Sequence, residues 1–153
     1  MNFSHVEITQ MNQLFPLIEE KLIDGHSVHF SPGGISMLPT LRQGKDTVVL
    51  SPLPNRLKKY DMVLYRRDND QYVLHRIIKI GDTYTCIGDN QFSPERGLRQ
   101  EQMIAIVTSF YRAGRYIKVN NPIYQLYCRI WHYSRLPRRI VRGGINRLRR
   151  HFS

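Results

Sequence analysis

The strongest constraint on the fold is a series of short runs, rich in β-branched and aromatic residues, along a chain of 153 residues. Turn-forming residues separate the runs: Pro52 and Pro54, the Asp-Asn-Asp sequence at 68–70, and Gly81 with Asp82. Short strands alternating with such turns indicate a mainly β body, twisted into a barrel or into coiled sheets. The predicted strands are residues 27–30, 47–50, 62–65, 71–80, 83–87 and 103–111.

An N-terminal helix is predicted ahead of these strands. Apolar residues recur every three or four positions between Ile8 and Ile23, as on one face of a helix. Gly25 is suited to end this helix, and Pro16 indicates a late start or a kink. Its expected role is packing.

Charge is distributed unevenly along the chain. Residues 1–110 contain 12 Lys and Arg and all 12 acidic residues, whereas residues 111–153 contain 11 Lys and Arg and no acid. The whole formal net charge of +11 therefore lies in the C-terminal part, which favours an anionic partner, either nucleic acid or a membrane surface. We divide the chain into a body, residues 1–111, and a C-terminal extension, residues 112–153.

Two helical segments are predicted in the extension. Residues 122–133 are aromatic, and Tyr124, Tyr127, Trp131 and Tyr133 are candidates for a membrane interface. After Ser134, apolar residues at helical spacing alternate with arginines, which predicts a basic amphipathic helix weakened by two adjacent glycines at 143 and 144. The alternative is a solvated helix that packs its apolar stripe on the body. The expected anion contacts are Arg135, Arg138, Arg139, Arg142 and Arg147.

Cysteine usage and the chain start bear on location. Cys86 and Cys128 fit neither a disulfide framework nor a metal-ligand spacing, so we expect free thiols, a reducing compartment, and neither metal nor cofactor. No apolar run is long enough to span a bilayer, and residues 1–5 do not start a signal peptide. The prediction is a cytoplasmic protein, peripheral at the inner face of the membrane.

Two residues suit nucleophilic catalysis. Ser36 lies in a loop with Gly33 and Gly34, which give the backbone freedom, and with Pro39, which restricts it. Such a loop can hold the Ser36 hydroxyl exposed, as a nucleophile requires. The same residues also suit an ordinary turn. His75 lies in the centre of the longest predicted strand. Alternation there predicts a partly desolvated imidazole that is neutral near pH 7, as a general base requires; the alternative is a hydrogen-bonded core histidine.

A carboxylate is also available to orient such a histidine. Asp89 belongs to a Gly-Asp-Asn sequence at a predicted strand end, and Glu95 follows six residues later. Gly-Asp-Asn is equally typical of a turn. Spacing alone does not decide between Asp89 and Glu95.

In this order and spacing, the segments resemble the type I signal peptidases and their relatives in the serine peptidase clan that includes the self-cleaving SOS repressors. The resemblance covers residues 33–107, about half of the chain. Residues 34–41 (GISMLPTL) resemble the Ser-Met-x-Pro-Thr-Leu nucleophile box, and residues 46–50 and 60–65 resemble the paired Asp-x-Val strands. Residues 73–78 (VLHRII) are similar to the general-base box, and residues 88–90 to the Gly-Asp-Asn box.

The resemblance implies a coiled β-sheet barrel and a catalytic pair of Ser36 and His75. Most bacterial signal peptidases have lysine as the base, so His75 is similar to the histidine subgroup, in which an acidic residue shortly after Gly-Asp-Asn completes a triad. Glu95 stands at about that place, and Asp89 is the other choice. Gly34 replaces a hydroxyl residue of many bacterial members, so the substrate and oxyanion contacts would come from Gly34, Met37 and backbone N–H groups. The family is anchored by transmembrane helices, which this sequence lacks.

The sequence thus predicts a serine endopeptidase whose substrates are leader or signal-like peptides, cleaved after a small residue. One alternative is a binding module for nucleic acid or membranes that uses the arginine-rich extension; the N-terminus shows no helix-turn-helix pattern. Another is a catalytically inactive relative that acts as a scaffold.

Overall fold

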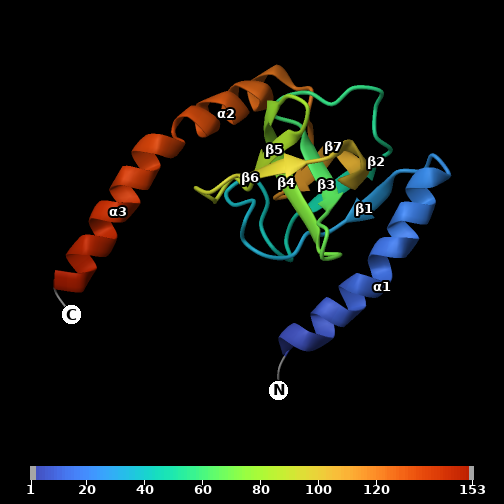
Figure 1. Ribbon diagram of the computed structural model, residues 1–153, viewed down its shortest axis with the longest axis horizontal. Helices are drawn as coiled ribbons and strands as arrows, with labels where there is room; N and C mark the ends of the chain where they lie inside the picture. The colour runs from blue at the N-terminus through green and yellow to red at the C-terminus, as the bar shows by residue number, and fades with distance from the viewer. Residues whose placement is uncertain (1–2, 152–153) are drawn as a thin grey trace.

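The computed structural model describes residues 3–151, with side chains described from residue 13. A helix, a sheet of eight strands and two further helices follow one another along the chain (Figure 1). The elements are α1 (Phe3–Ile23), β1 (Val28–Phe30), β2 (Thr47–Ser51), β3 (Met62–Arg66), β4 (Tyr72–Ile80), β5 (Tyr84–Ile87), β6 (Glu95–Leu98), a 3₁₀ turn (Gln100–Gln102), β7 (Met103–Arg112), β8 (Arg115–Lys118), α2 (Pro122–Tyr133) and α3 (Arg135–His151).

The sheet is antiparallel and open. Its strand order is β1-β2-β7-β3-β4-β5-β6, with β8 paired to the outer part of β7. Within the described residues β1 and β6 each pair on one side only, so the predicted barrel is wrong. Edge strands of three and four residues offer too few hydrogen-bonding groups to close a barrel on each other.

All six predicted strands are confirmed, with ends that differ by no more than one residue. Two strands were not predicted, β6 and β8. Both have four residues; β8 is largely exposed, and β6 buries only Leu98. β6 extends the sheet beyond β5 and places Glu95 opposite Cys86.

α1 packs against one face of the sheet. It runs through Pro16 from Phe3, so the predicted late start is wrong. Gly25, at φ +83°, ends the helix as predicted, with the His26 N–H donating to the Lys21 carbonyl at 3.0 Å. Phe15 is buried in the main core with Ile18 and Leu22, which confirms a packing role for this helix.

The main core lies between α1, the sheet and α2. Strand residues such as Val48, Leu50 and Phe110 meet the helices there, and α2 contributes Tyr124 and Cys128. A second core cluster contains Val63, Tyr65, Ile77, Cys86 and Leu98, with Val73 packed against it.

The extension consists of two different parts. β8 and α2 pack on the body, whereas α3 has no buried residue and runs away from the sheet (Figure 1). The helix continues through Gly143 and Gly144, and its apolar stripe does not pack on the body, which excludes that alternative. Among residues 3–151, none of the helices is both long and apolar enough to span a bilayer.

Candidate active site

Ser36 lies in the connection between β1 and β2, in residues 33–40, which we call the serine loop. Gly34 adopts φ +77°, a conformation that glycine takes without strain, and Met37 is buried in the main core and anchors the loop. Ser36 itself is half-buried. No group of the described residues forms a hydrogen bond with its hydroxyl or its N–H, so both are available to a substrate.

The Gly-Asp-Asn box, residues 88–90, contacts the backbone of the serine loop. The Asn90 N–H donates to the Ser36 carbonyl at 2.8 Å, and the Asn90 side chain donates to the Ile35 carbonyl at 3.1 Å. A Cβ atom at position 88 would stand 2.5 Å from the Ser36 carbonyl oxygen. This position therefore requires glycine.

Asp89 is held in a buried ion pair. Its two carboxylate oxygens accept hydrogen bonds from Nε and Nη2 of Arg76, both at 2.8 Å, and Thr40 donates to Oδ2 at 2.5 Å. Burial by itself would raise the pKa of Asp89, but Arg76 and Thr40 outweigh it and hold the pKa below its usual value. Asp89 does not hydrogen-bond to His75 in the described structure. Asp89 instead stabilises the end of the serine loop at Thr40.

Glu95 reaches His75 through a tyrosine. The Tyr65 hydroxyl donates to Glu95 Oε2 at 2.8 Å and lies 3.1 Å from Nδ1 of His75. Arg67 binds both oxygens of the same carboxylate, with Nε 2.9 Å from Oε1 and Nη2 2.8 Å from Oε2. Burial opposes the charge on Glu95, but the hydrogen bonds from Arg67 and Tyr65 lower its pKa below the usual value.

This chain of hydrogen bonds determines the tautomer of His75. The single hydroxyl proton of Tyr65 is donated to Glu95, so the Tyr65 oxygen accepts the hydrogen bond from Nδ1–H of His75. The lone pair of the neutral imidazole is therefore on Nε2. No described group binds Nε2, which leaves it free to accept a proton.

His75 is buried and neutral. Its exposed fraction is 4%, and it shares a face of β4 with Val73 and Ile77 as alternation predicts. Burial, helped by the positive charge of Arg67, lowers the pKa of His75 to about 4. The imidazole is therefore unprotonated throughout the neutral range.

Ser36 and His75 line one pocket of about 250 Å³. Gly33, Gly34 and Met37 form part of the wall on the side of the serine loop, and Arg67 lies on the strand side. No described hydrogen bond joins Ser36 to His75; such bonds are often long in free enzymes and tighten with substrate. A serine and a neutral histidine that line the same small pocket are the two residue types that acyl transfer uses.

α2 fastens the serine loop from the opposite side. The Tyr127 hydroxyl lies 2.8 Å from Thr40 Oγ1, which already donates to Asp89, so the tyrosine is the donor of this bond. Trp131 Nε1 donates to the Asp89 carbonyl at 2.8 Å, and Arg76 donates to the Tyr124 hydroxyl at 3.1 Å. All three aromatic residues hydrogen-bond to the body. Tyr124 is buried, so the interfacial role expected for it is wrong. Tyr127 and Trp131 are partly buried and Tyr133 is 69% exposed, and for these three the interfacial role stays a prediction.

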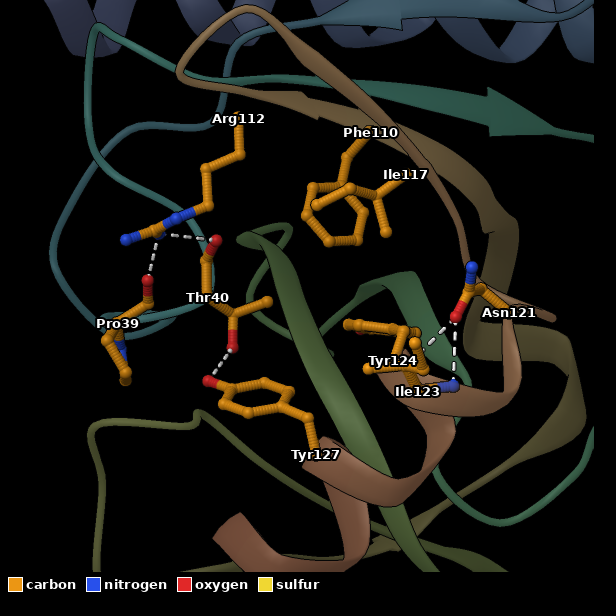
Figure 2. Close-up of a pocket in the computed structure, with 9 residues that line it drawn as sticks. All are labelled: Pro39, Thr40, Phe110, Arg112, Ile117, Asn121, Ile123, Tyr124 and Tyr127. Atoms are coloured by element: carbon orange, nitrogen blue, oxygen red, sulfur yellow. Dashed lines mark hydrogen bonds between the residues drawn. The ribbon is translucent and has the colours of Figure 1, made fainter.

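A second pocket, of about 410 Å³, lies between α2 and β7–β8 at the far end of the serine loop (Figure 2). Its walls include Phe110 and Ile117, and Figure 2 shows Arg112 reaching the carbonyl groups of Pro39 and Thr40. Arg112 thus braces the loop from this side.

The arginines expected to contact an anion fall into two groups. Arg135 donates to the Gln91 carbonyl at 3.0 Å, and the Arg138 guanidinium stacks on the Trp131 ring at 3.6 Å, so these two attach α3 to the body. The other three, Arg139, Arg142 and Arg147, are exposed, and Cζ of Arg142 lies 5.6 Å from the centre of the Phe92 ring.

Two residues of the site, Tyr65 and Arg67, were not predicted from the sequence. In the β3–β4 ladder His75 pairs with Val63, and Tyr65 is the diagonal neighbour on the same face. Only knowledge of this register would have revealed the contact. Among residues 13–151, whose side chains the structure describes, no three His, Cys, Asp or Glu side chains are grouped to hold a metal ion.

Comparison with family models, with curated proteins and with solved structures finds no match to this chain.

Proposed function

We propose that this protein is a serine endopeptidase of the signal-peptidase type, in which Ser36 is the nucleophile and His75 the general base. The observation that carries the proposal is the common pocket of Ser36 and His75, combined with a hydrogen-bond chain that leaves Nε2 of His75 unprotonated. Four motifs in family order support the same assignment.

The proposed reaction is hydrolysis of a peptide bond in two steps. Ser36 Oγ attacks the carbonyl carbon while Nε2 of His75 takes the hydroxyl proton, which then passes to the leaving amine as the C–N bond breaks. Water, deprotonated by His75, attacks the acyl-enzyme ester and releases the new carboxyl terminus and the Ser36 hydroxyl. The unpaired Ser36 N–H is suited to stabilise the oxyanion in both steps.

Glu95 acts as a positioning residue in this scheme. It accepts the hydrogen bond that the Tyr65 hydroxyl donates, which makes the tyrosine oxygen the acceptor for Nδ1–H of His75. As the imidazolium forms, the negative charge of Glu95, one hydroxyl away, stabilises it. Asp89 has a different role, because it supports the serine loop through Arg76 and Thr40.

The pocket and the motifs support one proposed substrate class. A pocket of about 250 Å³, walled on one side by Gly33 and Gly34, suits an extended peptide with a small side chain before the cleaved bond. Leader and signal-like peptides fit this description. The proposed location of the reaction is the cytoplasm, at the inner face of the membrane.

The test compares protein N-termini by mass spectrometry in source cells that carry the wild-type protein, Ser36→Ala or the control Ser93→Ala. Ser93 is exposed and outside the pocket. We expect a set of N-termini that is present with the wild type and with S93A and absent with S36A, and those termini define the cleavage motif. Identical termini in all three strains, with S36A folded and expressed, would refute the peptidase and favour a scaffold or a binding role.

A further inference from the structure

α3 presents an apolar stripe that nothing in the described structure covers. Leu136, Ile140 and Val141 are 68%, 69% and 61% exposed, and Ile145 and Leu148 are 48% and 60% exposed. More than half of the large hydrophobic side chains that are exposed among residues 13–151 belong to α2 and α3. A stripe of this kind on a helix that stands away from the body is unfavourable in water unless it has a partner (Figure 1).

The same helix is strongly basic. Seven arginines occur in its 17 residues, and no acidic residue occurs anywhere in residues 111–153. Arg139, Arg142 and Arg147 are exposed along it. A partner of this surface must therefore combine an apolar interior with negative charge at its edge.

We propose that α3 lies in the interface of an anionic lipid bilayer, with its apolar stripe among the acyl chains and its arginines at the headgroup phosphates. A helix with one aliphatic face, a polar face rich in arginine and low overall hydrophobicity is typical of interfacial helices. Each arginine near an anionic leaflet adds to the attraction. Nucleic acid would satisfy the arginines but would leave Ile140 and Val141 exposed, so the apolar stripe favours the bilayer.

The connection between α3 and the body is ordered by specific contacts. The Arg138 N–H donates to the Ser134 carbonyl at 3.0 Å, and the Arg138 side chain stacks on Trp131. Arg135 is bound to the Gln91 carbonyl, next to the Gly-Asp-Asn box. A bilayer that holds α3 therefore also sets the orientation of the body at the surface.

The experiment measures co-sedimentation of the full chain with vesicles of phosphatidylglycerol and phosphatidylcholine, and with phosphatidylcholine alone. The variant I140S/V141S removes part of the stripe and keeps every charge. Its matched control, L17S/I80S, removes two side chains that are 59% and 42% exposed elsewhere. R139Q/R147Q tests the charges, and far-UV circular dichroism of each variant reports its helix content.

We expect binding to the anionic vesicles, at least about tenfold weaker binding by I140S/V141S, weaker binding by R139Q/R147Q, and wild-type binding by L17S/I80S. Wild-type protein that stays in the supernatant with anionic vesicles at low salt would overturn the proposal, as would I140S/V141S binding like the wild type. Tighter binding to duplex DNA than to vesicles, unchanged in I140S/V141S, would establish nucleic acid as the partner instead. S36A is expected to bind vesicles normally, so this result is independent of peptidase activity.

Discussion

Gly88 lies so close to Ser36 that a single added methyl group would collide with the serine loop. A Cβ at position 88 would stand 2.5 Å from the Ser36 carbonyl oxygen, and because that oxygen belongs to the backbone it cannot rotate away as a side chain can. The backbone at Gly88 thus packs directly against the backbone of the nucleophile, Ser36.

Gly88→Ala should therefore displace the serine loop. We expect at least about tenfold lower peptidase activity and a free energy of unfolding lower by roughly 1–3 kcal/mol, as for overpacked sites. Gly81→Ala is the control, because a Cβ there meets its nearest atom at 4.0 Å. Peptide cleavage and urea denaturation measure the two effects. Wild-type activity in G88A would show that the contact is not needed.

Tyr65→Phe removes the hydroxyl between His75 and Glu95. We expect a lower kcat, and a loss of about 1–2 kcal/mol in stability because a partly buried hydrogen bond to Glu95 is lost. ¹⁵N NMR of the His75 imidazole distinguishes a positioning role from a structural one: the wild type should show the Nδ1–H tautomer, and Y65F a mixture. Tyr84→Phe, which loses an exposed bond to Gln100, should change neither. An unchanged tautomer in Y65F would contradict the proposed chain.

The peptidase should remain active in mild acid. A general base must be unprotonated, and the pKa of His75 is lowered to about 4, so kcat/KM should rise with pH through about 4 and be level from about pH 5.5 to 8. Peptide cleavage measured from pH 3 to 8 tests this. A midpoint near the ordinary histidine value of 6.5 would show that His75 is not held in its buried state or is not the base.

The same pKa shift makes stability depend on pH. Unfolded His75 binds a proton below about pH 6.5, whereas folded His75 binds one only below about 4, so acid favours the unfolded state between these values. As the pH falls from 6.5 to 4, His75 should cost up to about 3 kcal/mol of stability. Denaturant melts of the wild type and of His75→Gln over this range isolate the contribution. Parallel pH dependence in both proteins would contradict it.

Asp89→Asn should destabilise the protein strongly. It removes the charge that compensates the buried Arg76, and breaking such a pair from one side costs about 3–5 kcal/mol. Asp68 pairs with Arg99 at 2.7 Å on the surface, and Asp68→Asn should leave the thermal midpoint unchanged. Equal effects of the two substitutions in thermal melts would show that the Asp89–Arg76 pair does not support the fold.

Local sequence patterns predicted most of the sheet, because strands such as β2 and β3 carry the β-branched and aromatic residues that pack on a core. They did not predict β6, whose Glu-Arg-Gly-Leu sequence carries no strand signal and is extended because Cys86 pairs with Glu95. The barrel was also a wrong prediction, because pairing between the edge strands β1 and β6 depends on long-range geometry and not on composition.

The sequence predicted the nucleophile and the base of the candidate site. It did not predict Tyr65 and Arg67, which support the base. Ser36 and His75 stand in recognisable motifs, and the pocket that they share agrees with the pairing. The link from His75 to Glu95 depends on the register of β3 against β4 and on β6, neither of which the sequence displays. Packing of Tyr124 and Trp131 against the body could not be distinguished from membrane exposure, because aromatic residues suit both environments.

The contacts of α2 also set an order of events for the growing chain. Ser36, His75 and Asp89 leave the ribosome first, and Tyr124 and Cys128, which complete the main core around Arg76, follow later. Until about residue 133 is available, the buried Arg76–Asp89 pair is open to water and the serine loop lacks its brace from Tyr127. The nucleophile is thus made early and secured late.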